Sequence, residues 1–320
     1  MRKFLLAVAF FSVAAFAEKS ELKISKQYGL GYLPLIVAEE HKLIEKHAKA
    51  AGLGDVKVEW ATLSGGANAN DALLSGAIDL VSGGVAPFVR LWDKTNGKAK
   101  ALLALNEAPV VFVSNNPKVK TVRDLSDKDK IAVPSVKVSI QALTLQLAVS
   151  KEFGIKNYDK FDHLTVALKH PDAYAALSSG SEITGHIGLE PYSEIELLNP
   201  KNRKVFSSFD LFGAPHSTNL VWTSEDFYTK NPKLAKAIVD AINEADSWID
   251  AHRTEASDLY LNAYSSKEPK EVIQKIVKTV TYRSKPTENI TVFSDFLFET
   301  GAIKTKPKDW KELFFDAVEK

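Results

Sequence analysis

Two short turns rich in serine and glycine are the segments of this sequence best suited to bind a small ligand. The first is Ser64–Ala67 (SGGA), and the second is Ser135–Ser139, which contains Lys137. Each turn is predicted to follow a strand and precede a helix, where unpaired backbone N–H groups and a partial positive charge attract anions. Each turn alone could be an ordinary helix cap, but in matched positions the two predict an anion site.

Motifs for catalysis and for cofactor binding are missing from this sequence. It contains no GxSxG, HExxH, GxxxxGK[ST] or GxGxxG segment. It has no cysteines, which excludes disulfides, thiol chemistry and iron–sulfur clusters. The 7 histidines are scattered, and the spacing of His41 and His47 does not place them on one helix face. We therefore predict no cofactor, no metal site and no enzymatic activity.

One sequence pattern occurs twice. The segments Ala72–Phe88 (ALLSGAIDLVSGGVAPF) and Ala176–Tyr192 (ALSSGSEITGHIGLEPY) align without a gap. Both read as a helix end, a Ser-Gly stop, a short strand, a glycine and a proline that can open a new helix. The spacing is too long for a solenoid repeat, so the pattern predicts two lobes of similar construction.

The alternation of strand and helix patterns predicts an α/β fold with two doubly wound lobes joined by a two-strand hinge. We expect lobe one over residues 18–113 and 219–320, and lobe two over 114–218. The β-rich segments Pro109–Ser114 and Thr218–Thr223 are expected to cross between the lobes and to pair. The C-terminal helices, which begin near Glu225, are expected to pack on lobe one. Among individual elements, we expect one helix over 35–47, a strand over 205–210 and a last helix over 307–318.

The N-terminus has the features of a cleavable signal peptide over residues 1–17. Arg2 and Lys3 precede the apolar run Phe4–Phe16, and Ala15–Ala17 is a small-x-small cleavage site. No other stretch is apolar enough to span a bilayer, so we expect a periplasmic protein with no direct membrane insertion. The formal net charge is only +1 and no basic block occurs, so nucleic-acid binding is not expected. We expect a monomer.

Three segments resemble the periplasmic substrate-binding proteins of ABC importers for nitrate, sulfonate and taurine, which share the NMT1/THI5-like domain. These segments are Gly31–His47, Ser64–Gly84 and Ile187–Glu194. The resemblance covers nearly all of the chain after the leader. It implies the type II periplasmic-binding-protein fold, a ligand held in the cleft by lobe closure, and docking on an inner-membrane permease with a cytosolic ATPase.

The resemblance also implies where a ligand binds in this sequence. The loops that match the family's cleft follow the strands of both lobes and the return crossing. The substrate-binding residues predicted in this way are Tyr28, Gly29, Tyr32, Leu33, Ser64, Gly65, Gly66, Ala67, Gly83, Gly84, Ser135, Val136, Lys137, Ser139, Glu190, Tyr192, Thr218 and Asn219. The glycine-rich loop 29–32 and Leu43, which replaces a usual glycine, depart from the family pattern.

Several of these residues suggest the chemistry of the ligand. Lys137 and the turn amides favour an anionic head group, and Tyr28, Tyr32 and Tyr192 either wall an apolar body or belong to the core. Glu190 could pair with an ammonium group, as in a zwitterion such as taurine, or cap local backbone. Two other ligand-binding roles remain open: binding of a thiamin-pyrimidine precursor or another aromatic solute, and ligand sensing in the periplasm. An enzyme on the same fold is disfavoured, because the cysteine-rich signature of the fungal thiamin-pyrimidine synthases is absent.

Overall fold

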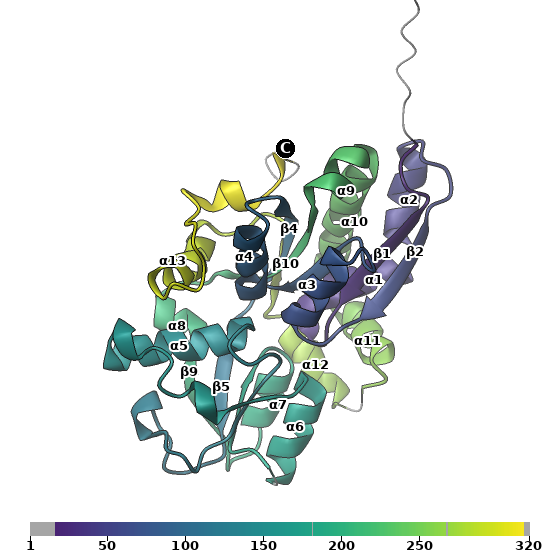
Figure 1. Ribbon diagram of the computed structural model, residues 1–320. Helices are drawn as coiled ribbons and strands as arrows, with labels where there is room; N and C mark the ends of the chain where they lie inside the picture. Colours follow the sequence, from purple (N-terminus) through teal and green to yellow (C-terminus); the bar gives the residue numbers. More distant parts are fainter. Residues whose placement is uncertain (1–16, 181, 267, 317–320) are drawn as a thin grey trace, which may run out of the picture.

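The described strands lie in two lobes: the first holds a four-stranded sheet with a two-stranded parallel pair beside it, and the second holds a five-stranded mixed sheet (Figure 1). The computed structural model describes residues 17–180, 182–266 and 268–316. All but the last residue of the predicted signal peptide lie outside the described residues. None of the described helices is both long enough and apolar enough to cross a lipid bilayer.

The sheet of the first lobe combines N-terminal strands with strands from the C-terminal part of the chain. Its strands are β1 (Glu21–Lys26), β2 (Lys57–Thr62), β3 (Val81–Gly84), β4 (Ala99–Glu107), β10 (Ser217–Ser224) and β11 (Thr281–Tyr282). The order is β11-β4-β10-β3, and the β1-β2 pair joins beside β3 through a parallel bridge between Ile24 and Leu80. β10 runs antiparallel to both β3 and β4.

The sheet of the second lobe repeats this arrangement. Its strands are β5 (Val111–Ser114), β6 (Ile131–Val133), β7 (Thr165–Ala167), β8 (Gly185–Gly188) and β9 (Arg203–Ser207), in the order β7-β6-β8-β5-β9. The two lobes share one strand order. It is β2-β1-β3-β10-β4 in the first lobe and β7-β6-β8-β5-β9 in the second, and β10 and β5 are the antiparallel strands at matching positions. The prediction of two lobes of similar construction is therefore confirmed. Gly76 and Gly180, which end the repeated helices, both have positive φ angles.

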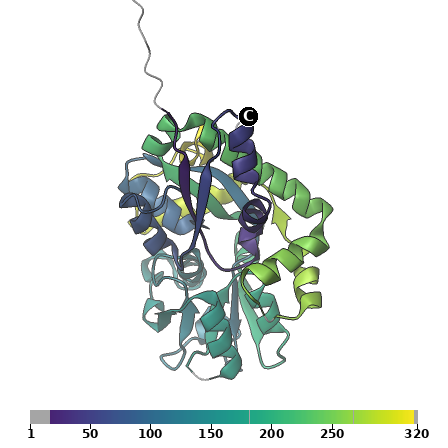
Figure 2. The ribbon, with the colours of Figure 1, turned by 90° about the vertical axis from the view of Figure 1, so that its right-hand side faces the viewer.

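Helices cover both lobes. The first lobe carries α1 (Leu33–Glu40), α2 (Leu43–Ala50), α3 (Gly66–Leu74), α4 (Val85–Lys94) and the C-terminal helices α9 (Glu225–Lys230), α10 (Pro232–Ala251), α11 (Arg253–Ala263), α12 (Lys270–Val277) and α13 (Thr291–Glu299). The second carries α5 (Ile140–Phe153), α6 (His170–Ser179), α7 (Tyr192–Leu197) and α8 (Ser208–Phe212). Figure 2 shows α11 and α12, in light green, close to the junction of the lobes.

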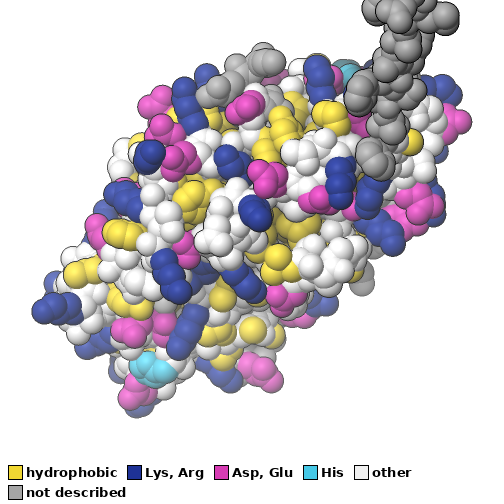
Figure 3. Space-filling model, turned by 45° about the horizontal axis from the view of Figure 1, so that its top comes forward, with side chains coloured by type: hydrophobic (Ala, Val, Ile, Leu, Met, Phe, Trp, Pro, Cys, Tyr) yellow, Lys and Arg dark blue, Asp and Glu magenta, His cyan; other side chains and the backbone are white. Residues whose placement is uncertain are grey.

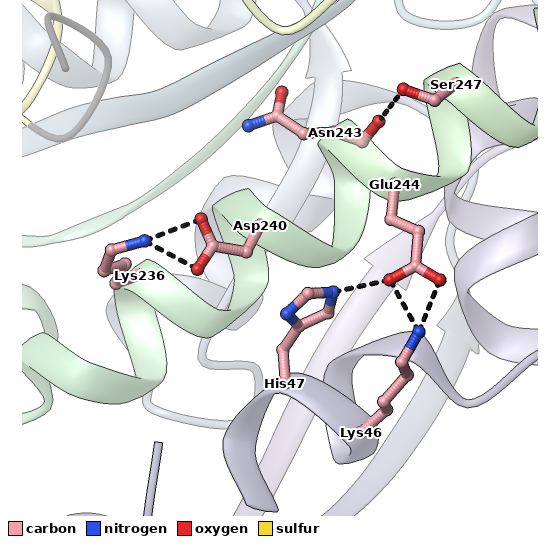
Figure 4. Close-up of polar contacts among 7 residues, drawn as sticks. All are labelled: Lys46, His47, Lys236, Asp240, Asn243, Glu244 and Ser247. Atoms are coloured by element: carbon pink, nitrogen blue, oxygen red, sulfur yellow. Dashed lines mark hydrogen bonds and ion pairs between the residues drawn. The ribbon is translucent and has the colours of Figure 1, made fainter. Parts of the chain in front are cut away.

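The longest helix, α10, packs by its apolar face and exposes its charged face. The predicted stripe of Leu234, Ile238, Ile242, Ala245 and Ile249 is buried along its whole length. On the other side Glu244 pairs with two residues of α2: its Oε1 lies 2.6 Å from Lys46 Nζ, and its Oε2 lies 2.8 Å from His47 Nε2 (Figure 4). Exposed pairs of this kind contribute about 0–1 kcal/mol, so apolar burial holds the two helices together.

Three expected elements differ from the structure. The helix expected over 35–47 is interrupted at Lys42, which has φ 50° and separates α1 from α2. The strand expected over 205–210 ends at Ser207, because the Ser207 side chain accepts a hydrogen bond from Asp210 N and starts α8. The helix expected over 307–318 is, in its described part, a single 3₁₀ turn at Trp310–Leu313, after which Phe315 N bonds to Ala101 O of β4.

The two crossing segments lie side by side, but β5 and β10 do not pair with each other. Each is instead the antiparallel strand of a different sheet. Ser208 exchanges hydrogen bonds with Val110, since Ser208 N donates to Val110 O (2.8 Å) and Val110 N donates to Ser208 Oγ (2.9 Å). The predicted lobe boundaries fall inside β5 and β10. We propose that the chain changes lobe slightly earlier, at 107–110 and 208–216.

Candidate functional site

A small cavity lies between the two lobes. Its volume is about 20 Å³, and its walls come from both lobes: Gln27, Tyr28, Tyr32, Gly65, Gly66, Gly84, Pro87, Pro134, Ser139, Ile140, Gln141, His170, Leu189 and Asn219. One water molecule requires about 10–15 Å³ of such space. The lobes are therefore closed on each other, and a larger ligand requires them to separate or their side chains to move.

Five helices begin at this cavity. Wall residues supply the N-cap or first turn of α1 (Tyr32), α3 (Gly65, Gly66), α4 (Gly84, Pro87), α5 (Ser139, Ile140, Gln141) and α6 (His170). The first N–H groups of a helix have no intrahelical partner, and each helix start carries a partial positive charge. No Asp, Glu, Lys or Arg stands among the described wall residues. Among the described wall residues, the backbone dipoles at these helix starts therefore favour an anion over a cation.

The two turns predicted to bind an anion meet across the cavity. Gly65 has φ 81°, and a Cβ atom on it would lie 2.3 Å from Ser135 Oγ and 3.2 Å from the carbonyl oxygen of Pro134. Gly66 approaches Pro87 of α4 just as closely, since a Cβ there would lie 2.3 Å from Pro87 Cγ. Gly65 is therefore needed for the lobes to close, whereas Gly66 is needed for α3 to pack against α4 within the first lobe.

Polar side chains hold the first-lobe wall in place. Gln27 Nε2 donates to Ser82 O (2.9 Å), and its Oε1 accepts from Gly65 N (3.2 Å), which ties β3 to the start of α3. Tyr32 donates its hydroxyl proton to Asn219 Oδ1 (3.1 Å), and burial raises the pKa of this tyrosine above its usual range. Asn219 Nδ2 in turn donates to Asn106 Oδ1 (3.1 Å). These groups are preorganised neutral hydrogen-bond partners.

The structure places seven of the predicted residues on the cavity wall. They are Tyr28, Tyr32, Gly65, Gly66, Gly84, Ser139 and Asn219. Ser64, Ala67, Ser135 and Val136 lie beside them in the same turns without lining the cavity. Lys137 is exposed and also stands off the wall, although its carbonyl oxygen accepts a hydrogen bond from Arg90 Nη2 of the other lobe (3.2 Å).

The remaining predicted residues support the wall from behind. Leu33 is buried in the core of the first lobe, Gly83 packs against Gln27 and Trp222, and Thr218 Oγ1 bonds to Ala108 O at the crossing. Gly29 and Glu190 meet between the lobes, because a Cβ on Gly29 would lie 3.0 Å from Glu190 O. These residues do not line the cavity but pack behind the residues that do, and so influence its shape.

Glu190 and Tyr192 lie at the junction of the lobes. Glu190 O accepts a hydrogen bond from Leu30 N (2.9 Å), which links the second lobe to the first. The Glu190 carboxyl is buried and is not on the cavity wall; burial and the nearby Glu194 raise its pKa well above its usual range. Tyr192 stacks on His170, with 5.7 Å between ring centroids.

Seven wall residues were not predicted from the sequence: Gln27, Pro87, Pro134, Ile140, Gln141, His170 and Leu189. Most adjoin predicted positions, for Gln27 precedes Tyr28 and Gln141 follows Ser139 by two residues. His170 begins a helix directly after β7, and the rule that ligands collect at the carboxyl ends of strands could have located it. Among residues 17–180, 182–266 and 268–316, no group of three or more acidic or histidine side chains is placed to hold a metal ion.

Two lobes with matching mixed sheets around a cleft define the periplasmic-binding-protein fold. The chain belongs to the NMT1-like family, which matches residues 15–261. No curated protein matches the sequence.

Solved structures share this fold. The alkanesulfonate-binding protein SsuA from Xanthomonas axonopodis pv. citri, bound to MOPS, has a TM-score of 0.71 and 17% identity, over 91% of this chain and 96% of that one. The periplasmic aliphatic sulphonate-binding protein SsuA from Escherichia coli has a TM-score of 0.68 and 21% identity, over 94% and 99%. The periplasmic nitrate-binding protein NrtA from Synechocystis PCC 6803 has a TM-score of 0.64 and 17% identity, over 88% and 81%.

Proposed function

We propose that this protein is the periplasmic solute-binding component of an ABC importer and that it captures a small organic anion or zwitterion. The observation that carries the proposal is the convergence of five helix starts on a cavity whose described walls bear no charged side chain. Each helix start contributes about 0.3–1 kcal/mol to anion binding, and up to about 2 kcal/mol when partly buried. The names of the structural neighbours, which bind sulfonates or nitrate, agree with this chemistry.

The mechanism is capture by closure of the lobes. Gly65, Gly66 and Gly84 belong to the first lobe, whereas Ser139 to Gln141 belong to the second, so one ligand can bridge both. A ligand that binds the closed form more tightly than the open form shifts the equilibrium toward closure by that difference in affinity. The closed protein then presents a surface, formed by both lobes, that an inner-membrane permease with its ATPase can recognise. We propose that it acts as a monomer in the periplasm, after removal of residues 1–17.

A thermal-shift panel tests the proposal. The mature chain is heated with alkanesulfonates, taurine, nitrate, carboxylates and thiamin precursors, each over a range of concentrations. At a free ligand concentration 100 times its dissociation constant, the expected stabilisation is about 2.7 kcal/mol, a shift of several degrees in Tm. We expect this shift with a small organic anion. Stabilisation only by thiamin precursors would favour the aromatic-solute alternative, and no shift with any class would contradict the proposal.

The mixed charge of the protein surface is consistent with an anion that binds in the cavity and not on the surface. On the face shown in Figure 3, acidic and basic side chains alternate, with no large area of one sign. Charge on this face is therefore mixed, whereas the backbone dipoles concentrate positive potential at the cavity. A small anion would gain more from the cavity than from this face.

A further inference from the structure

A chain of four polar side chains runs from the cavity into the second lobe. Gln141 Nε2 lies 3.1 Å from His170 Nε2, His170 Nδ1 lies 2.9 Å from His186 Nε2, and His186 Nδ1 lies 2.6 Å from Glu196 Oε1. Gln141 and His170 line the cavity, whereas His186 and Glu196 lie deep beneath them. The exposed fraction of each of the four residues is 6% or less.

With the Gln141 amide oriented as in this structure, the hydrogen bonds of this chain have one consistent direction. An amide nitrogen cannot accept a hydrogen bond, so Gln141 Nε2 donates and His170 Nε2 is unprotonated. His170 then carries its proton on Nδ1 and donates it to His186 Nε2. His186 in turn carries its proton on Nδ1 and donates to the Glu196 carboxylate. A neutral His170 agrees with its burial and with the nearby His186, which together place its pKa well below the usual range.

This direction determines what the cavity offers to a ligand. Because Nε2 of Gln141 is held by His170, its Oε1 is left to accept, and no described residue donates to that oxygen. We infer that Gln141, oriented by His170, His186 and Glu196, selects ligands that carry an N–H or O–H donor in addition to their anionic group. This inference rests on the proposed function, and it narrows the ligand to an amino- or hydroxy-substituted anion.

Glu196 is the residue that sets the direction. As a carboxylate it can only accept, so it keeps the proton of His186 on Nδ1. A glutamine in its place can donate as well as accept, which allows every hydrogen bond of the chain to reverse. In the reversed state His170 donates to Gln141 Oε1, and the amide N–H groups face the cavity instead. Glu196→Gln should therefore weaken the preference for a donor without removing the anion site.

The direction is measured first by NMR, without any ligand. In protein labelled with ¹⁵N-histidine, two-bond ¹H–¹⁵N spectra distinguish Nδ1–H from Nε2–H rings, and His170→Phe and His186→Phe assign the signals. We expect Nδ1–H tautomers for both rings in the native chain and in Glu194→Gln. Glu194 is a control, because it is a partly buried carboxyl of the same helix that bonds to Ser193 and not to the histidines. An Nε2–H tautomer or an imidazolium at either position would overturn the inference, whether or not any ligand binds.

Selectivity is measured by calorimetry with three probes of similar size. Taurine and isethionate carry an N–H or O–H group at the position where propane-1-sulfonate has a methyl group. We expect the native chain and Glu194→Gln to bind the two donors at least tenfold more tightly than propane-1-sulfonate. In Glu196→Gln this ratio should fall severalfold. Equal binding of all three probes by the native chain would overturn the inference while supporting an anion site. Failure of all three to bind would exclude a small sulfonate as the ligand and leave the proposed function to the other anions of the panel, while the tautomers would still test the hydrogen-bond direction.

Discussion

At the scale of single residues, backbone conformation at a few glycines sets how closely the lobes approach. Gly65 and Gly76 lie at the two ends of α3 and have φ angles of 81° and 75°. Both therefore occupy a backbone conformation that other residues adopt only with strain. They differ in their surroundings, because Gly65 contacts the second lobe and Gly76 faces open space. Gly76 therefore serves as a control for the effect of placing a side chain at a positive φ away from the second lobe.

Gly65→Gln is expected to weaken ligand binding at least tenfold while the fold remains intact. Its Cβ would lie 2.3 Å from Ser135 Oγ, so the lobes cannot close as they do in this structure. Gly76→Gln also places a side chain at a positive φ, but nothing lies within 4 Å of its Cβ. Calorimetry with the best ligand of the panel should show normal affinity for Gly76→Gln. Equal affinities for the two variants would mean that the ligand site lies elsewhere.

The sequence predicted the backbone part of the cavity better than its side chains. Gly65, Gly66 and Gly84 were expected because small residues after a strand have a physical meaning of their own. Gln141 and His170 were not, since an amide or imidazole at a helix start has no special role until its partner is known. Their partners, His186 and Glu196, come from another strand and another helix. Only the fold brings these four residues together.

At the scale of elements, the order of strands followed from the sequence more reliably than the ends of helices. The repeated pattern around Gly76 and Gly180 predicted two similar lobes, and the two sheets confirm it. The break at Lys42 was missed because a lysine with a positive φ leaves no composition signal. The last expected helix was wrong because Phe315 bonds to the edge of the first lobe's sheet, a long-range contact. Local patterns do not contain such contacts.

Helix α10 carries a titratable group that should make stability depend on pH. Asp246 is buried, and burial with a smaller contribution from Asp250 raises its pKa to about 8. The folded state therefore keeps this proton over a range in which the unfolded chain, with a pKa near 3.9, has lost it. The free energy of unfolding should fall as pH rises from about 4 to 8, by at most about 1.4 kcal/mol per pH unit from this group, and level off above.

Asp246→Asn should remove this dependence. The amide is neutral at every pH, so the gain in Tm of the variant over the native protein should grow between about pH 4 and pH 8 and then stay constant. Asp240→Asn is the control, because Asp240 lies on the exposed face of the same helix and pairs with Lys236 (2.6 Å; Figure 4). Thermal unfolding from pH 4 to pH 9 measures both variants. A constant difference between Asp246→Asn and the native protein would contradict the raised pKa.

At the scale of the whole molecule, each lobe contains one antiparallel strand that the chain forms directly after it crosses from the other lobe. β5 of the second lobe follows β4 of the first lobe in the chain, and β10 of the first lobe follows β9 and α8 of the second lobe. In the lobe division proposed above, the chain crosses between the lobes near 107–110 and 208–216, and α4 and α5 with their apolar side chains meet across the junction. This architecture suits a rotation of two preformed lobes about two short segments.

A pair of engineered cysteines should report that rotation, because the native chain contains none. Gly84 ends β3 in the first lobe, and Ile140 begins α5 in the second. A Cβ on Gly84 would lie 3.0 Å from Ile140 Cβ, slightly closer than the 3.5–4.5 Å of a disulfide. Gly84 has φ −69°, so a cysteine there carries no left-handed strain. The double variant Gly84→Cys/Ile140→Cys should therefore form a disulfide when the lobes are nearly closed.

Under mild oxidation the double variant should cross-link, and the cross-linked protein should neither take up nor release ligand until a reductant is added. Because ligand favours closure, a saturating ligand that tolerates the two substitutions should also speed the cross-linking. Non-reducing electrophoresis follows the reaction, and each single cysteine variant serves as the control for changes in the cavity wall. Free exchange of ligand in the oxidised protein would show that the lobes do not enclose it. No cross-link with or without ligand would show that the protein does not close in solution as it does here.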